Sequence, residues 1–506
     1  MRKIAHVALA TAALATATVM PAFADGPTIN GSGSTWSAIA IDQWRADVRN
    51  SKGLTVNYNS VGSSSGREYY ISLGDQTDFA VSEIPFVGDE PDRLASHKRT
   101  YQYLPIVAGG TALMYNLKDS AGRQVRDLGL SAATIAGIFT GKIKSWDDPK
   151  ITADYGKPLP KLAITPVIRS DGSGTSAQFA AYLAYEAKSV WTPFAKDKML
   201  DPNIPVSNYP DLGNSIAQKG SDGIANYVAN PIVGVGAIGY LESSYAVQRN
   251  FPVASVKNRS GKFVLPTSRN VSTALTKATL YADRTQNLTG VYSNADPAAY
   301  PISSYSYMIV PKKTGMAADK ASVLGRFMLY FACDGQSSAS LLGYSPLPKN
   351  LVSIVFDAVR DLPAGRPDAP AEPTAANCKN PTLTGSLGEG ADILRGSADY
   401  GTGGSATGTA TNAGTGTTGG GTGAGTGATG GGTGAATGAT GGSTGGGNNG
   451  VYSALQPTRL TLSPGAGSTL PIVGIALAAL LLGPIVISTL FKRRSSAPKI
   501  EDEAQA

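Results

Sequence analysis

Apolar residues between Asp25 and about Arg395 recur with the spacing of helices in some segments and of strands in others. In TWSAIAIDQWRADV they fall at Ile41, Trp44 and Val48, which share one face of a helix. The next segment, GLTVNYNSV, alternates apolar and polar residues as a half-buried strand does. DFAVSE and LPIVAGGTALMYN are typical of strands, and SAATIAGIFTG predicts a helix. This alternation predicts an α/β fold with largely parallel sheets.

The composition separates a globular part from a tether. Residues 25–396 have an ordinary mixture of residue types and, at about 370 residues, are too long for a single core, so we expect two lobes. Residues 397–450 consist largely of glycine, threonine and alanine. Such a segment cannot bury enough apolar surface to fold, so we expect a disordered linker. A juxtamembrane segment, residues 451–469, follows it.

Both ends of the chain carry membrane-targeting patterns. Residues 1–24 contain two basic residues, an apolar run and the small-residue pattern AFA, which predict a secretory signal peptide. Residues 470–491 form an uncharged run long enough to cross a bilayer as a helix, although a buried core helix is an alternative. The basic residues that begin the tail, 492–506, favour the cytoplasmic side. We therefore expect a single-pass membrane protein whose bulk lies outside the cell.

Histidine, cysteine and charge exclude several kinds of chemistry. His97 is the only histidine after the signal peptide, so a zinc site of the usual imidazole type lacks ligands, and no metal or cofactor is expected. A Ser-His-Asp relay would need His97, which lies in the charged stretch ASHKRT and is expected at the surface. Cys333 and Cys378 lie on the exported side, which favours one disulfide over two free thiols. The formal net charge of +7 is too dilute to indicate nucleic-acid binding.

Three segments rich in serine, threonine and glycine stand where a strand is followed by a helix. They are GSGSTW (31–36), VGSSSGREYY (61–70) and IRSDGSGTSAQF (168–179). The start of a helix offers unpaired N–H groups and a partial positive charge, and Arg169 could give two parallel hydrogen bonds to an oxyanion. Asp171 could hold that guanidinium in place. Together these corners predict an anion pocket, although each alone is also an ordinary glycine turn of an α/β fold.

Glu83 is unusual because its carboxylate would end an apolar strand close to this anion pocket. The arrangement makes sense if the ligand carries a proton that the carboxylate can accept. Phosphate at neutral pH has such a proton and sulfate does not. A solvated surface glutamate is the alternative interpretation of Glu83.

At these residues the chain resembles the substrate-binding protein of bacterial ABC-type phosphate importers. The resemblance covers about residues 29 to 350. It is carried, in order, by GSGSTW, VNYNSVGSSSG, DFAVSEIP, FTGKIKSWDD, IRSDGSGTS, GSDGIANYV, GAIGYLESSYA and YPISSYSYMIV. It implies a two-lobed periplasmic-binding-protein-like fold with phosphate in the hinge cleft. The first lobe would span about 27–108 and 300–380, and the second about 109–299.

The resemblance also assigns roles to residues. It implies that phosphate is bound by Thr35, the backbone at Trp36, Ser63, Glu83, Arg169, Ser173, Gly174 and Thr175. Asp171 would orient Arg169. The chain departs from the family in two places: Trp36 stands where phenylalanine is usual, and Glu83 stands where the family has the shorter aspartate, which leaves pocket size and ligand identity open.

Three functions remain for comparison. The first is a membrane-tethered inorganic phosphate-binding protein that serves the permease and ATPase of an ABC importer. The second is a cell-surface adhesin or anion sensor that keeps the fold. The third, a phosphoester hydrolase, needs a metal or a base that the residues do not supply, so we expect no enzyme activity.

Overall fold

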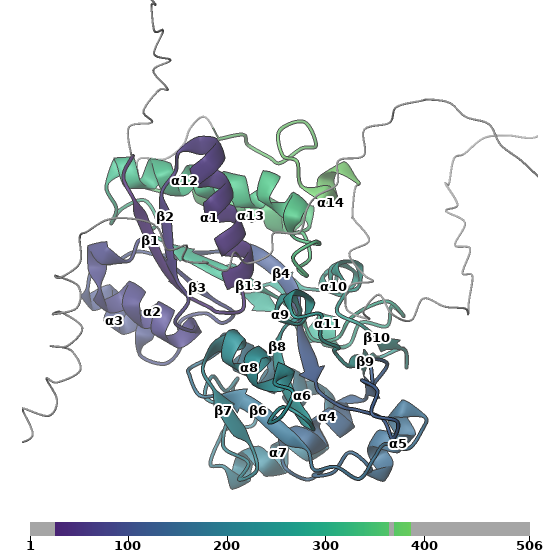
Figure 1. Ribbon diagram of the computed structural model, residues 1–506. Coiled ribbons are helices and arrows are strands. Elements are labelled where there is room, and N and C mark those ends of the chain that lie inside the picture. Colours follow the sequence, from purple (N-terminus) through teal and green to yellow (C-terminus); the bar gives the residue numbers. More distant parts are fainter. Residues whose placement is uncertain (1–25, 364–368, 386–506) are drawn as a thin grey trace, which may run out of the picture. The chain divides into compact units, whose positions relative to one another are not determined.

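The computed structural model describes residues 26–363 and 369–385 (Figure 1). The strands are β1 (Ile29–Gly33), β2 (Val56–Asn59), β3 (Phe79–Ser82), β4 (Gln102–Tyr115), β5 (Gly129–Leu130), β6 (Thr165–Arg169), β7 (Ile216–Gln218), β8 (Ala237–Glu242), β9 (Ser255–Lys257), β10 (Phe263–Val264), β11 (Thr279–Leu280), β12 (Gln286–Asn287) and β13 (Ser303–Val310). The α-helices are α1 (Ala38–Lys52), α2 (Ser63–Ser72), α3 (Glu90–Ser96), α4 (Ala132–Phe139), α5 (Pro149–Tyr155), α6 (Gly174–Glu186), α7 (Lys188–Asp197), α8 (Gly220–Ala229), α9 (Ser243–Gln248), α10 (Ser268–Leu275), α11 (Thr289–Tyr292), α12 (Ala318–Ala332), α13 (Lys349–Arg360) and α14 (Pro381–Thr384).

The main sheet has eight strands in the order β2-β1-β3-β13-β4-β8-β6-β7. The pairs β1–β2, β1–β3, β6–β7 and β6–β8 are parallel, whereas β13 and β4 run antiparallel to their neighbours. The prediction of largely parallel sheets is therefore wrong for the centre of the sheet. The sheet is mixed because β13 returns late in the sequence and inserts between β3 and β4.

Strand β4 belongs to both halves of this sheet. Its residues 102–110 pair with β13, and its residues 111–115 pair with β8. We call β2, β1, β3 and β13 with their helices the first half, and β8, β6 and β7 with theirs the second half. Figure 1 shows β4 running from the region of α13 toward β8. The two halves are thus joined by a continuous strand.

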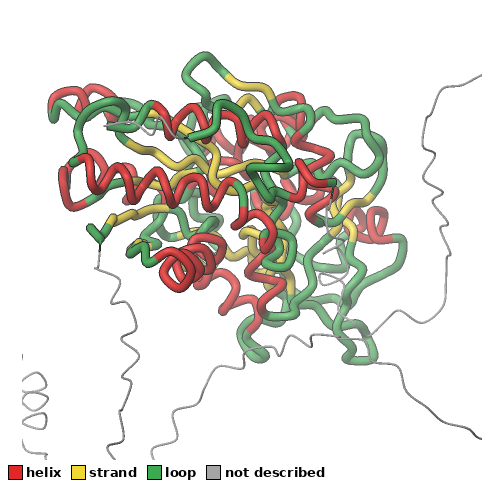
Figure 2. Tube along the Cα trace, turned by 90° about the horizontal axis from the view of Figure 1, so that it is seen from above, coloured by secondary structure: helices red, strands yellow, loops and turns green. Residues whose placement is uncertain are grey.

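Helices cover the strands of each half. In the first half α2 packs on β1 and β3, α13 packs on β4, and α1 packs against α12. In the second half α8 packs on β6 and β8, and α6 packs on β8. Seen from above, the strands run between helices (Figure 2). A smaller sheet, β10-β9-β5, and a hairpin, β11–β12, lie outside the main sheet.

The helices and strands predicted from the spacing of apolar residues are present in the structure at the predicted positions. Ile41, Trp44 and Val48 are fully buried along α1, and Tyr58 is half-buried on β2. The helix predicted in SAATIAGIFTG is α4, whose N-cap Ser131 accepts a hydrogen bond from the amide of Thr134. These agreements follow from amphipathic spacing, which local sequence determines.

The predicted disulfide is present, with Cys333 and Cys378 joined by a 2.06 Å S–S bond. His97 is exposed at the C-terminal end of α3, as predicted. Among the described residues, no helix combines the length and the apolar character that a membrane span requires. The predicted signal peptide, linker, membrane helix and cytoplasmic tail lie outside the described residues.

Candidate functional site

The three serine- and glycine-rich corners meet in the structure. The corner after β1 and the corner before α2 are joined by the amide of Gly62, which donates to the carbonyl oxygen of Gly33 over 2.8 Å. The corner before α2 in turn contacts the one after β6, since the amide of Ser64 donates to the carbonyl of Gly172 over 3.1 Å. The prediction that these corners converge is therefore confirmed. The third corner belongs to the second half of the sheet, so the meeting point lies between the halves.

Two glycines allow this close approach. Gly62 has a φ of 99°, and a Cβ there would stand 2.5 Å from Oδ2 of Asp171. A Cβ on Gly174 would stand 2.3 Å from Oε2 of Glu83. Any larger residue at either position would push the corners apart. These two glycines thus allow the two halves of the sheet to approach each other closely.

Glu83 directly follows β3 and is buried, with 1% of its surface exposed. Its Oε2 accepts a hydrogen bond from Ser63 Oγ over 2.7 Å, and its Oε1 accepts from Ser306 Oγ over 2.7 Å and also from Ser34 Oγ. The alternative of a solvated surface glutamate is wrong. The carboxylate is held by hydroxyl groups, and no salt bridge in the described part of the chain involves it.

Arg169 ends β6, and its side chain is 1% exposed. Its Nε donates to Oδ1 of Asp171 over 2.8 Å, and its Nη2 donates to Oδ2 of the same carboxylate. The amide of Gly220 also donates to Asp171 Oδ1, over 2.9 Å. Burial alone would raise the pKa of Asp171, but the hydrogen bonds and charge of Arg169, with the amide of Gly220, outweigh burial and lower that pKa. Asp171 therefore stays ionised and holds one edge of the guanidinium through these hydrogen bonds.

Helix α6 begins at the same place. Ser173 is its N-cap, and its Oγ accepts a hydrogen bond from the amide of Ser176 over 3.2 Å. The hydroxyl proton of Ser173 is not used in that bond. Gly174 and Thr175 belong to the first turn and are buried, and Gly174 lies beside Glu83. First-turn amides have no partner within their own helix, so this turn can donate hydrogen bonds to an anion.

Thr35 and Trp36 stand before α1. Oγ1 of Thr35 accepts a hydrogen bond of 3.1 Å from the amide of Ser221, which opens α8 in the second half. The amide of Trp36, expected to face a ligand, instead donates to Oγ of Ser34 over 3.0 Å. The indole of Trp36 is fully buried and meets the ring of Tyr344 edge-on at 5.8 Å. A ligand at this amide would have to replace the hydroxyl of Ser34.

The assembled site offers one guanidinium held by the carboxylate of Asp171, a second carboxylate at Glu83, and several hydroxyl and amide groups. Such a set suits an anion that both accepts hydrogen bonds and donates one. The described residues contain no group of three or more histidine, cysteine, aspartate or glutamate side chains placed to hold a metal ion.

Comparison with known proteins identifies the family. A family model described as a PBP superfamily domain matches residues 13–334. The phosphate-binding protein PstS of Xylella fastidiosa is 32% identical over 326 residues, which cover 64% of this chain and 82% of that protein. The chain belongs to the PstS family. The phosphate-binding protein PstS 2 of Mycobacterium tuberculosis is 31% identical over 340 residues, covering 65% of this chain and 86% of that protein.

Solved structures agree on the fold. A crystal structure of a DING protein matches with a TM-score of 0.52 at 20% identity, covering 65% of this chain and 93% of that one. A phosphate-bound periplasmic phosphate-binding protein, PfluDING, matches with a TM-score of 0.50 at 20% identity over 65% of this chain and 93% of that one. The predicted α/β periplasmic-binding-protein-like fold is thus confirmed. Because the PstS family consists of binding proteins, the prediction that the chain is not an enzyme is confirmed as well.

Several residues of the site were missed by sequence reasoning. Ser34 and Ser306 hold the carboxylate of Glu83, and Ser221 binds Thr35. Gln178 donates from Nε2 to the carbonyl oxygen of Glu83 over 2.7 Å. Ser34, Ser306 and Ser221 stand inside segments used for the family resemblance, so their positions were visible. Their contacts were not, because each joins segments far apart in the sequence.

Proposed function

We propose that this PstS family member is an extracytoplasmic protein that binds inorganic phosphate and delivers it to an ABC importer. One observation carries the proposal. The buried Arg169–Asp171 pair and the buried Glu83, which is bound by hydroxyl groups, lie where the three serine- and glycine-rich segments contact one another. The curated relatives, which are phosphate-binding proteins, support it. We infer that the two halves of the sheet are the two lobes that close over the anion.

In this proposal each residue has a defined task. Arg169, fixed by Asp171, supplies the positive charge, and the first turn of α6 supplies donors. Further hydrogen bonds come from hydroxyl or amide groups of Thr35, Ser173, Gly174 and Thr175. Trp36 and Ser63 donate to the ligand in place of their present bonds to Ser34 and Glu83. Glu83 accepts the proton of the ligand. The carboxylate therefore distinguishes a protonated tetrahedral anion from one that has no proton to give.

Titration calorimetry with phosphate and with sulfate tests the proposal. We expect phosphate to bind tightly and sulfate to be weaker by about 10⁴-fold or more, because sulfate would face the carboxylate of Glu83 without a shared proton. In Glu83→Gln the amide can donate to sulfate, so the difference between the two anions should shrink by at least about tenfold. Tight sulfate binding by the unmodified protein would contradict the role of Glu83. Absence of binding to both anions would favour the adhesin or sensor.

A second test concerns the hydrogen bond that crosses the two halves. Gln178, on α6, reaches the main-chain carbonyl of Glu83, which also receives Nε2 of Gln286 over 3.1 Å. Gln178→Leu removes the first donor and leaves the second. We expect phosphate to dissociate about two- to tenfold faster, with little change in association, because Gln178 and Glu83 belong to different halves and separation of the halves would break their bond. Stopped-flow fluorescence measures both rates.

Gln43→Leu is the matched control for this change. Gln43 is exposed on α1 and bonds only to Asp47 of its own helix among the described residues, over 2.8 Å. Its replacement should leave both rate constants unchanged. Equal dissociation rates for Gln178→Leu and the unmodified protein would show that the bond does not contribute to closure.

We further propose that residues 470–491 anchor the protein and that residues 397–450 tether the binding domain near a permease in the same membrane. A tether raises the effective concentration of the domain at its partner. Deleting residues 470–506 should release the protein into the medium and lower phosphate uptake by cells at micromolar phosphate. Uptake that is unchanged on release would remove the need for anchoring in transport.

A further inference from the structure

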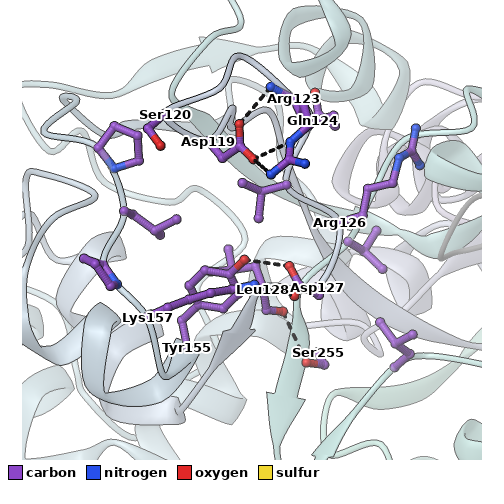
Figure 3. Close-up of a pocket in the computed structure, with 16 residues that line it drawn as sticks. Asp119, Ser120, Arg123, Gln124, Arg126, Asp127, Leu128, Tyr155, Lys157 and Ser255 are labelled. Atoms are coloured by element: carbon purple, nitrogen blue, oxygen red, sulfur yellow. Dashed lines mark hydrogen bonds and ion pairs between the residues drawn. The ribbon is translucent and has the colours of Figure 1, made fainter. Parts of the chain in front are cut away.

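The second half of the molecule contains a large cavity that shares no residue with the proposed phosphate site. Its volume is about 910 Å³. The segment after β4, the loop between α5 and β6, and the stretch around β9 form its walls (Figure 3). Its size lies within the range of small-molecule sites, about 300 to 1,000 Å³.

The floor of the cavity is apolar and rigidly held. Leu128 and Val253 line it and are buried. Val253 forms an isolated bridge with Met114 of β4, and the next amide, that of Ala254, donates to the carbonyl of Leu113 over 2.9 Å. The floor is therefore fixed to the central strand of the sheet. A ligand would meet a preformed apolar surface.

Most charges around the cavity are already neutralised. Asp119 pairs with Arg123 at 2.8 Å, and Asp127 pairs with Lys157 at 2.9 Å. Tyr155 donates its hydroxyl proton to Asp127 over 2.6 Å. Figure 3 draws the contacts of Asp119 with Arg123 and of Tyr155 with Asp127 as dashed lines. Neither carboxylate is left without a positive partner.

Arg126 is the exception. No hydrogen bond or ion pair of its guanidinium occurs within residues 26–363 and 369–385, and its Nη1 is buried without a hydrogen-bond partner. Nε2 of Gln124, on the same wall, is also buried and has no partner. Figure 3 shows Arg126 well apart from Lys157, with Leu128 between them in the view. Both atoms are hydrogen-bond donors without an acceptor, and the three cationic side chains of the lining outnumber its two carboxylates, so the surplus charge is positive.

We propose that this cavity binds an organic carboxylate with an apolar body. The carboxylate would accept hydrogen bonds from Arg126 and Gln124, and the apolar body would lie on Leu128, Val253 and Leu265. A small inorganic anion would satisfy the donors but would leave the apolar floor uncovered. A neutral apolar molecule would cover the floor but leave the two donors unpaired. The two features together therefore specify the class of ligand.

Titration of the full-length protein with three probes tests this assignment. The probes are 2-naphthoate, its neutral amide 2-naphthamide, and acetate. We expect saturable binding of 2-naphthoate with at least about tenfold weaker binding of the amide, because the amide cannot form a charge-assisted bond with Arg126. Acetate should show no saturable binding, because it lacks the apolar body. No saturable 2-naphthoate binding at millimolar concentration, or equal binding of the amide, would overturn the proposal.

Two variants locate the site. Arg126→Met should weaken 2-naphthoate binding by about tenfold or more, whereas Arg123→Met, at the paired arginine, should change it by less than about threefold. Ser255→Phe, which places a ring inside the cavity, should also abolish binding. The thermal unfolding curve of each variant, followed by circular dichroism, reports whether the protein is folded. Unchanged 2-naphthoate binding in both Arg126→Met and Ser255→Phe would place the probe elsewhere and overturn the assignment.

Discussion

Replacing Arg169 with methionine is expected to weaken phosphate binding by about 2–5 kcal/mol, or roughly 30-fold to a few thousand-fold. The guanidinium is buried and already fixed by Asp171. Its removal would leave both the anion and the carboxylate of Asp171 without the positive charge that compensates them. The pKa of Asp171 should then rise, because burial would act without the opposing charge. Calorimetric titration with phosphate measures the loss directly.

Two further variants distinguish the loss of positive charge at Arg169 from a nonspecific effect of replacing an arginine. Arg169→Lys keeps the positive charge but cannot form two parallel hydrogen bonds, so its affinity should lie between those of the methionine variant and the unmodified protein. Arg45→Met changes a half-exposed arginine that pairs with Asp42 at 2.9 Å and should leave phosphate affinity unchanged. If Arg169→Met bound phosphate as tightly as the unmodified protein, the proposed site would be wrong.

Replacing Glu242 with glutamine is expected to stabilise the protein at alkaline pH. Glu242 ends β8 opposite Thr111 of β4, where the strand passes between the two halves, and it is fully buried. Burial raises the pKa of its carboxyl group from 4.5 to about 8, although hydrogen bonds from Ser243 and Ser244 act in the opposite direction. The native protein thus holds a proton that the unfolded chain releases above pH 4.5. Folding stability should fall as the pH rises from about 4.5 to 8 and then level off.

Urea unfolding between pH 4 and 9 measures this effect. Each unit of pKa difference corresponds to about 1.4 kcal/mol, so Glu242→Gln should match the unmodified protein near pH 4 and exceed its stability by several kcal/mol above pH 8. Tyr245, Tyr300 and Tyr344 face Glu242, but burial raises the pKa of each, so they stay protonated over this range. If the unfolding free energies of the two proteins changed in parallel with pH, the carboxyl group of Glu242 would have its ordinary pKa in the folded state, and the prediction would be wrong.

The local elements, including the serine-capped start of α6, were predictable from sequence, and the reasons are physical. The spacing of Ile41, Trp44 and Val48 fixes the buried face of α1 without reference to any other segment. In the same way, an arginine, an aspartate and a serine cap before α6 indicated an anion-binding helix start. The residues that carry each of these signals lie close together in the sequence. Over such a short stretch the periodicity of the helix or strand determines which way each side chain points.

Long-range pairing was not predictable. All fourteen residues of β4 are buried, so no alternation reveals which neighbours it has or in which direction they run. Strand β13 pairs with β4 although nearly two hundred residues separate the two strands in the sequence. No local sequence pattern indicates such a distant pairing. The same holds for Glu83, whose environment is set by Ser306, 223 residues away in sequence. The burial of this carboxylate therefore had to be observed.

The Cys333–Cys378 bond affects how the protein would bear mechanical load. It links the end of α12 to the segment before α14 and closes a loop of 45 residues that contains α13. Tension applied to the chain beyond Gly385 would reach α12 through the covalent bond and bypass α13. Because α13 packs on β4, the strand common to both halves, that strand would keep its supporting helix while the C-terminal end is under strain.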